Sequence, residues 1–571
     1  MGTCAYSSRT VGFLSRLEEP AGHAAKPQDP DALFRFDSGR CLLQAEAVKS
    51  VLVLGGTGSG KTTSVVLPII GELLRRGHAG VILDIKGNLR EQTRVLAQRC
   101  GREDDIVEFG SDITANKVNL LAGLRLHEIR ELFKAIAVQG LERDPNIFWH
   151  EKGATHATDV AHVLYSLSRI APRSHFSRQF IPTLKTVYAV LTNRALAKGL
   201  WQFYSFEKAR LQQNAGNRKM QHILDTEETF SNAIQSDNFH VLIPKTTSSR
   251  SYEEQITWNL QRLLSQLSAL KMTHAVMDRF SSRNEDAMPL DFDDLVYRQK
   301  KIVLIHFSPD CGTAGSILSR CLKERFYQAV LRRGRMLAKG QYTFLVGDEF
   351  QEIVDVNPGI RLNDMGFFSV SREFRNINII ATQSIASLYA RGSKNAITSL
   401  LGNCTTKIFL QNSDAATQTW GRDMQCAGDI KSLGRGECLI EGIDMQGNVV
   451  SRRDSVNNAH ASVAGILARQ TAGQPRIASN STDPDGISYG PSGLPACIER
   501  CLQNLPRPAD APGKKEAQQA GKGNEPYAEM CRRLTRMRDL SCQGKPYWQT
   551  DFDAEDAPTD DEAEPSRRMS L

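Results

Sequence analysis

Short runs of apolar and β-branched residues recur along the chain, separated by longer stretches in which apolar positions have helical spacing. Six of these runs have the length and composition of buried strands: 50–54 (SVLVL), 81–85 (VILDI), 302–307 (IVLIHF), 343–346 (TFLV), 377–381 (INIIA) and 407–410 (KIFL). Strands that alternate with helices form a parallel sheet covered by helices on both faces. The pattern therefore predicts an α/β fold.

The pattern changes between 126 and 282, where helical spacing dominates, as in LHEIRELFKAIAV and YEEQITWNLQRLLSQLSALKM. We interpret this region as an all-α domain inserted into the α/β domain, which is then discontinuous and spans 45–125 and 283–453. Residues 1–44 are predicted to be irregular. Residues 454–571 are rich in Pro, Gly, Ser and Asn and are predicted to be largely disordered, apart from a modest helical stretch at 528–540.

Charge is distributed unevenly over the 571 residues. The net charge is +7, but 551–571 hold eight acids and two arginines, a local −6, so the remainder carries +13. A basic body with an acidic tail fits a polyanion partner and a separate interaction tail. The twelve cysteines lack paired zinc-ligand spacing and are interpreted as reduced thiols. With no apolar run long enough to cross a bilayer, a cytoplasmic protein is expected, which could reach the inner membrane through a partner.

A glycine-rich loop follows the first predicted strand. Gly55–Thr62 (GGTGSGKT) fits G-x-x-x-x-G-K-[ST], with a strand before it and a helix after it. In such a loop, backbone N–H groups and the helix N-terminus bind phosphates, the lysine contacts the β- and γ-phosphates, and the hydroxyl coordinates Mg²⁺. The sequence therefore predicts an ATP–Mg²⁺ site formed by Gly55, Gly56, Thr57, Gly58, Ser59, Gly60, Lys61, Thr62 and Thr63.

Two acids follow the strand at 343–346. Asp348 is predicted to bind Mg²⁺ together with Thr62, and Glu349 to polarise the attacking water, because hydrolysis requires a metal carboxylate and a base. Gly347 is unusual at this point, since a bulkier apolar residue is expected in a central strand. Paired acids also occur at solvated strand ends, which is the alternative interpretation.

Two further polar residues flank the strand at 377–381. Gln383 follows it, where a polar side chain can reach a γ-phosphate, and Arg372 precedes it. A cation at that position could stabilise transition-state charge on the γ-phosphate of a neighbouring subunit. Spacing alone favours the simpler interpretations, a glutamine in a loop and a solvated arginine.

Several local motifs, in order, resemble the type IV coupling proteins of the TraG/TraD family, the DNA-pump ATPases of conjugation and type IV secretion. They are Pro68 in KTTSVVLPII, the D-x-K-G motif at Asp84–Gly87, the pair Phe148-Trp149, and the segments FLVGDEFQ, SREFRNINIIATQS and GNCTTKIFLQN. The spacing from Arg372 to Gln383 matches the family's arginine finger and motif glutamine. The resemblance covers about residues 45–450. Family members usually carry N-terminal transmembrane helices, which are not found here, and Asn88 stands where an acid often follows the K-G pair.

The resemblance implies a RecA-like P-loop fold, catalytic roles for Lys61, Glu349, Arg372 and Gln383, and a homohexameric ring that moves DNA through its centre. It also implies relaxase or relaxosome proteins and secretion-channel ATPases or a membrane partner as partners. The function expected is an ATP-driven DNA translocase that delivers DNA or a relaxase–DNA complex to a type IV secretion or conjugation system. The alternatives are a cytosolic DNA translocase of chromosome segregation or repair, and a nucleotide-switched cargo receptor for protein substrates.

Overall fold

The computed structural model describes a large part of the chain between residues 31 and 459. The described residues are 31–87, 89–139, 147–170, 180–213, 250–273, 276–283, 287–338, 340–360, 362–423, 429–443 and 449–459. Asn88, the helical stretch expected at 528–540 and the acidic tail lie outside them.

A nine-stranded sheet forms the centre of the α/β domain, in the order β11-β10-β9-β3-β8-β7-β4-β6-β5. Neighbours from β9 to β5 pair in parallel, whereas β10 pairs antiparallel with β9 and β11. The strands are β3 (Val51–Leu54), β4 (Ala79–Asp84), β5 (Ile106–Gly110), β6 (Ile302–His306), β7 (Thr343–Asp348), β8 (Asn376–Thr382), β9 (Thr406–Phe409), β10 (Glu437–Ile443) and β11 (Val449–Ser455). All six predicted strands are therefore present.

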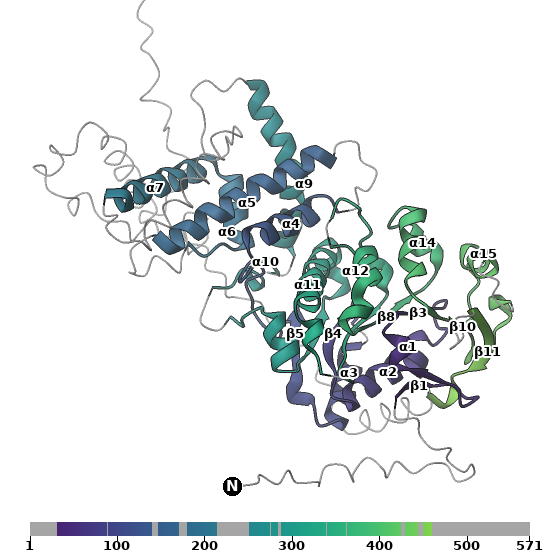
Figure 1. Ribbon diagram of the computed structural model, residues 1–571. Coiled ribbons are helices and arrows are strands. Elements are labelled where there is room, and N and C mark those ends of the chain that lie inside the picture. Colours follow the sequence, from purple (N-terminus) through teal and green to yellow (C-terminus); the bar gives the residue numbers. More distant parts are fainter. Residues whose placement is uncertain are drawn as a thin grey trace, which may run out of the picture.

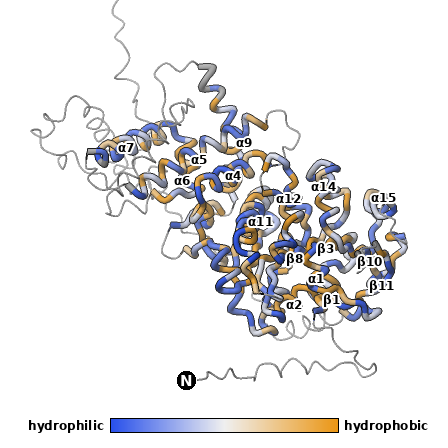
Figure 2. Tube along the Cα trace, in the orientation of Figure 1, coloured by the Kyte–Doolittle hydropathy of each residue, from blue (hydrophilic) through white to orange (hydrophobic). Residues whose placement is uncertain are grey.

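Helices cover both faces of this sheet (Figure 1). One face packs against η2 (Lys61–Val66), α2 (Leu67–Arg75) and α3 (Leu89–Arg99). The other packs against α11 (Gly312–Arg333), α12 (Asp364–Val370), α13 (Ile385–Tyr389) and α14 (Lys394–Gly402). Successive strand residues alternate between the two cores, as Leu52 and Val53 do. Figure 2 shows the apolar residues gathered where helices and strands meet.

Between β5 and β6 the described chain is mainly helical. It forms α4 (Leu126–Ala137), α5 (Ile147–Ile170), α6 (Leu184–Thr192), α7 (Arg194–Gln213), α9 (Arg250–Met272) and α10 (Val276–Arg279). Figure 1 shows these helices gathered together, with α11 between them and the sheet. Their apolar residues belong to the same buried cluster as one face of the sheet. No described helix is long and apolar enough to cross a membrane.

The segment 1–44, predicted as irregular, contains two strands in its described part. β1 (Ala32–Arg35) and β2 (Cys41–Leu43) form an antiparallel pair, with Gly39 in the left-handed conformation at the turn. Leu33 and Phe34 are buried in the core that also contains α2, so this short segment gains its order from packing.

The remaining elements are α1 (Gln44–Ala47) before β3, α15 (Ala415–Asp423) after β9, and the short turns η3 (Glu103–Asp105), η5 (Asp293–Arg298), η6 (Pro309–Cys311), η7 (Gly334–Met336) and η10 (Ile430–Ser432).

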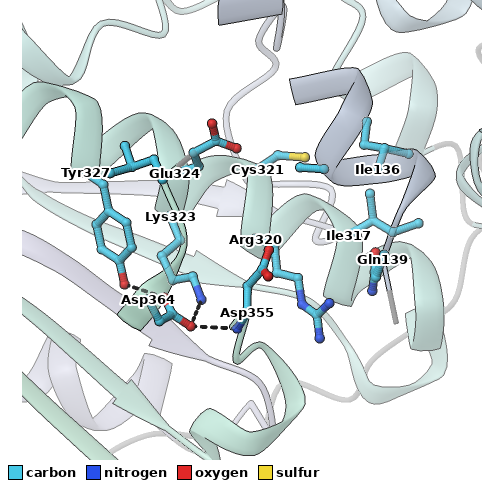
Figure 3. A pocket seen from close by; sticks show the side chains of 12 residues that line it. Ile136, Gln139, Ile317, Arg320, Cys321, Lys323, Glu324, Tyr327, Asp355 and Asp364 are labelled. Atoms are coloured by element: carbon cyan, nitrogen blue, oxygen red, sulfur yellow. Dashed lines mark hydrogen bonds and ion pairs between the residues drawn. The ribbon is translucent and has the colours of Figure 1, made fainter. Parts of the chain in front are cut away.

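A buried cluster of charged side chains joins α11 to the segment that follows β7 (Figure 3). Lys323 donates to the backbone oxygen of Ile353 (2.6 Å) and to Asp364 (2.8 Å), which also accepts from the Tyr327 hydroxyl (2.8 Å). The backbone N–H of Asp355 donates to the same carboxylate (2.7 Å). Because an ion pair stripped of water is stable only when its remaining hydrogen bonds are satisfied, these contacts fix α11 against the loop.

Glu324 also lies in this region, and no ion pair is recorded for it in the described part of the chain. It lines a cavity of about 10 Å³, room for roughly one water molecule. Burial, with the nearby charges of Asp355 and Glu131, raises the pKa of Glu324 to about 8. The folded protein therefore keeps a proton on this side chain at neutral pH that the unfolded chain has lost.

This linkage predicts a pH-dependent effect of Glu324→Gln. The stability that the Glu324 proton provides is fully present below the pKa of the unfolded chain, about 4.5, and is lost as pH rises through 8. A glutamine has the shape of the neutral acid and does not ionise. The melting temperature of Glu324→Gln should therefore exceed that of the wild type by roughly 2–5 °C at pH 8.5, with a smaller difference at pH 6.

Thermal melting by circular dichroism across this pH range measures the difference. Glu91→Gln, at an exposed position on α3, controls for the loss of one carboxylate. A difference between Glu324→Gln and the wild type that stays constant from pH 6 to pH 8.5 would show that Glu324 does not carry the proton.

Candidate active site

The loop between β3 and η2 folds back on itself around the Lys61 side chain. Gly58 and Gly60 have φ angles of +77° and +90°, in the left-handed region that favours glycine. A Cβ at Gly55 would lie 2.9 Å from the Cβ of Leu410, so only glycine fits there. Lys61 Nζ donates to the backbone oxygen of Gly55 (2.8 Å). The loop thus presents an ammonium group and open backbone N–H groups at the start of a helix.

Strand order brings the predicted chemical groups to the same edge of the sheet as this loop. β8 lies between β3 and β7, and β4 flanks β7. All four strands are parallel, so their carboxyl ends share one edge. The glycine-rich loop follows β3, Gln383 follows β8, and Glu349 follows β7. This edge is where ligands bind in open α/β sheets.

Asp348 and Thr62 are brought together across 286 positions of sequence. The Thr62 hydroxyl donates to Asp348 Oδ2 at 2.7 Å. Burial raises the pKa of Asp348, the Thr62 hydrogen bond opposes this, and the charge of Glu349 adds to it. A hydroxyl and a carboxylate are the oxygen ligands that Mg²⁺ prefers. No group of three or more metal-ligating side chains occurs in the described part of the chain, so phosphates and water would have to complete the coordination shell.

The Glu349 carboxylate is buried and bonded on both oxygens. Oε1 accepts from Lys86 Nζ at 2.5 Å, and Oε2 accepts from Gln351 Nε2 (2.6 Å) and Gln383 Nε2 (2.9 Å). Burial alone would raise the pKa of Glu349, but the hydrogen bonds from Lys86 and Gln351 outweigh burial and hold this pKa below its usual range. The side chain is therefore an ionised carboxylate in a fixed position, which suits a base acting on water.

The nearby cation Lys61 is itself affected by burial, which lowers the pKa of its ammonium, whereas the charges of Glu349 and Asp348 raise it. An ammonium in these surroundings lacks a strong anionic contact of its own, because its recorded hydrogen bonds go to backbone oxygens. Ser59 Oγ, also buried in the loop, has no hydrogen-bond partner in the described structure. Both groups fit a site that receives phosphate oxygens.

Gly347, which looked out of place in a central strand, is explained by the residue packed over it. A Cβ at this position would approach Phe350 Cδ2 to 2.7 Å. Phe350 opens the turn η8 (Phe350–Glu352), and Glu349 before it has a φ of +51°. Glycine thus lets the chain turn sharply so that Glu349 lies at the strand edge.

Arg372 is the predicted site residue that does not join the others. It lies in η9 (Ser371–Phe374), before β8, whereas Gln383 follows β8. A strand of seven residues separates the two positions by roughly 23 Å. The side chain of Arg372 is exposed, and the described structure records no side-chain hydrogen bond or ion pair for it. Arg372 therefore lies at the opposite edge of the sheet from the glycine-rich loop of its own chain.

Sequence reasoning assigned no role to two residues that contact Glu349. Gln351 donates to Glu349 and accepts from the hydroxyl of Thr382 (2.7 Å), which ties β7 to the end of β8. Lys86 belongs to the D-x-K-G motif on which the family resemblance partly rests, but its ion pair with Glu349 depends on the β4–β7 pairing. Only the register of that pairing reveals the contact.

Comparisons with known proteins match most of the described chain. A family model described as Type IV secretory system Conjugative DNA transfer matches residues 15–158. Another, described as Type IV secretion-system coupling protein DNA-binding domain, matches residues 203–455. A Mycoplasma pneumoniae protein described as uncharacterized is 28% identical over 106 residues, which is 18% of this chain and 67% of that protein.

Solved structures of the plasmid coupling protein TrwB share the fold. The structure in complex with ADP and Mg²⁺ and the one with the ATP analogue ADPNP each have a TM-score of 0.52 and 13% identity. Each comparison covers 75% of this chain and 89% of that chain. The RecA-like α/β fold predicted from the sequence is confirmed.

The packing over Gly347 predicts that Gly347→Ala displaces Glu349. The added methyl group overlaps Phe350, and relief of such an overlap typically costs about 1–3 kcal/mol of stability. Thermal melting should show a lowered melting temperature. A crystal structure of the variant should show the Glu349 carboxylate shifted away from Lys86.

Gly402→Ala is the matched control, because a Cβ there meets no atom within 4 Å. If Gly347→Ala melts like Gly402→Ala and keeps the Glu349–Lys86 contact, glycine is not required at this position.

Proposed function

Because the chain belongs to the type IV coupling-protein family of conjugative DNA transfer, we propose that it is an ATP-driven DNA translocase. Its cargo would be DNA or a relaxase–DNA complex, delivered to a type IV secretion or conjugation system. The observation that carries this proposal is the convergence of the Lys61 loop, Asp348 and Glu349 at one edge of the sheet. Binding alone needs only the loop, whereas turnover needs the two acids as well.

Nucleotide binding follows from the glycine-rich loop. Its backbone N–H groups and the helix N-terminus would hold the phosphates of ATP, and Lys61 would exchange its backbone contacts for β- and γ-phosphate oxygens. Thr62 and Asp348 would hold Mg²⁺, which supplies charge neutralisation on the phosphates when bound. The TrwB structures described as complexes with ADP and Mg²⁺ and with an ATP analogue support this assignment.

Hydrolysis would depend on Glu349 and Gln383. Glu349 would accept a proton from the attacking water as the water oxygen bonds to the γ-phosphorus and the β–γ bridging oxygen leaves with ADP. Gln383 directly follows β8, the strand between β3 and β7, and its amide donates to the Glu349 carboxylate at 2.9 Å. Its amide could therefore contact the γ-phosphate and the Glu349 carboxylate at the same time.

Assembly of several copies of the chain would bring Arg372 to the active site of a neighbouring copy. At roughly 23 Å from the carboxyl end of its own strand, this side chain cannot reach its own γ-phosphate. An exposed guanidinium without a recorded partner can serve the site of a neighbouring copy. We therefore include a homohexameric ring in the proposal, in which each subunit offers Arg372 to the next.

DNA binding is supported by the DNA-binding-domain family model, which matches 203–455. The +13 charge outside the acidic tail favours contacts with phosphates, which carry no base sequence. Relaxosome proteins and secretion-channel ATPases, or another membrane partner, would then determine which DNA is delivered and where.

ATPase measurements with and without DNA test the function. Wild-type protein should hydrolyse ATP in the presence of Mg²⁺, and DNA should stimulate the rate. Lys61→Ala should bind ATP weakly and not turn over, because it loses the phosphate contact. Glu349→Gln should bind ATP but turn over about 10²–10⁴-fold more slowly, because it loses the base.

Salt dependence provides the control for phosphate contacts. DNA affinity should fall steeply between 50 and 200 mM salt, as expected when counterions are released.

A wild-type protein that binds ATP but shows neither hydrolysis nor DNA stimulation would favour the nucleotide-switched receptor for protein cargo. Turnover by Glu349→Gln close to the wild-type rate would remove Glu349 from the role of base.

Mixing two inactive variants tests the role of Arg372 across the interface. Arg372→Ala keeps its phosphate loop, and Lys61→Ala keeps its arginine. In a mixed ring, a Lys61→Ala subunit can offer Arg372 to the intact loop of an Arg372→Ala neighbour. Mixtures should therefore regain part of the wild-type ATPase rate, measured against each variant alone.

Native mass spectrometry shows whether mixed rings form. If they form and the rate stays at that of the separate variants, Arg372 does not act on a neighbour. Arg435→Ala, which removes an arginine outside the proposed site, controls for the loss of one exposed positive charge.

A further inference from the structure

Lys86 contacts the Glu349 carboxylate from a neighbouring strand. In the β4–β7 pairing, Asp84 lies opposite Asp348. Lys86 follows Asp84 by two positions and Glu349 follows Asp348 by one, so both leave the sheet at the same level. The result is the 2.5 Å contact between Lys86 Nζ and Glu349 Oε1.

The loop that carries Lys86 is held by Asp84. The Asp84 carboxylate accepts hydrogen bonds from the backbone N–H groups of Gly87 (2.8 Å), Leu89 (2.9 Å) and Arg90 (2.8 Å). It thereby satisfies free N–H groups at the start of α3. Gly87 has a φ of +82°, and a Cβ there would lie 3.0 Å from His306 Cε1. The turn Asp84–Gly87 is therefore held in one conformation, and Lys86 extends from it beside β7.

In the described part of the chain, Lys86 is the only recorded donor to Glu349 Oε1. The other Glu349 oxygen is occupied by the uncharged amides of Gln351 and Gln383. The Glu349 side chain is 5% exposed, whereas the Lys86 side chain is 44% exposed. Without Lys86, Oε1 would be a buried carboxylate oxygen lacking any recorded donor, which is costly enough to make the group turn away from its position.

We propose that Lys86 is a positioning residue for hydrolysis, whose ammonium holds the Glu349 carboxylate at the sheet edge where it can act on water. The assignment rests on the proposed ATPase function and adds the residue on which the geometry of the base depends. Asp84 and Gly87 support it in turn, because they determine where Lys86 stands. This gives the D-x-K-G segment a physical role.

The split between kcat and ATP affinity separates positioning from general stability. Lys86 contacts the Glu349 carboxylate, whereas the glycine-rich loop holds the nucleotide in the proposed function. Loss of Lys86 should therefore lower turnover and leave ATP affinity nearly unchanged, and a second cation at the same position should restore turnover.

Lys86→Met, Lys86→Arg and the control Lys394→Met test this in the full chain. Lys394→Met removes the same charge from an exposed position on α14. We expect Lys86→Met to lower kcat about tenfold or more at pH 7.5, with ATP affinity within about twofold of wild type, since Lys86 acts on the base and not on the nucleotide. Lys86→Arg should restore most of the rate.

A Lys86→Met protein with wild-type or faster turnover would overturn the proposal. So would a fall in kcat that Lys86→Arg fails to rescue, or one that comes with a matching loss of ATP affinity, which would indicate a merely structural role. If Lys86→Met does not fold, Lys86→Gln removes the charge but keeps a donor, and the same fall in kcat with ATP affinity nearly unchanged is required. Absence of hydrolysis by the wild type would instead reject the proposed function itself.

Discussion

The parallel register between β4 and β7 is the constraint on which the candidate site depends. It places Asp84 opposite Asp348. Asp84 then fixes the loop carrying Lys86, Asp348 meets Thr62, and Glu349 meets Lys86. A slip of one residue would turn every side chain of β7 to the other face of the sheet. The chemistry at this edge is therefore specified by the apolar strands behind it, whose burial on both faces determines their register.

Placing two adjacent acids at a buried strand end is unfavourable, and the surrounding structure offsets the cost. Burial raises the pKa of Asp348, and the charge of Glu349 adds to this. Glu349 also has a φ of +51°, a conformation that costs about 1–3 kcal/mol for residues other than glycine. Hydrogen bonds from Thr62, Lys86 and Gln351 compensate, so the strained arrangement persists because several elements hold it together.

Much of this could be predicted from the sequence, and the limits have physical causes. Apolar runs identified β3, β4 and β6–β9, and the glycine-rich loop was identified by its spacing. β5 was missed because its IVEFG run includes Glu108, which is buried only because Arg90 and Arg94 pair with it. Likewise, β10 contains Glu441, whose buried partner is Lys407 on β9. Side chains that look solvent-exposed in sequence become buried when a distant cation neutralises them.

Spatial relations between strands were the other limit. Local sequence predicted that Gln383 and Arg372 flank one strand, but only the order of the parallel strands shows that Gln383 shares an edge with Glu349 and Arg372 does not. The position of Glu349 also depends on contacts with the turn η8, which follows it directly. Lys323 lies over the Phe350 ring at 4.8 Å and bonds to the Ile353 carbonyl oxygen, while Ser316 bonds to the Glu352 carbonyl oxygen. Any shift of Glu349 must therefore be accommodated within η8 or displace α11. That helix packs against the helices inserted between β5 and β6.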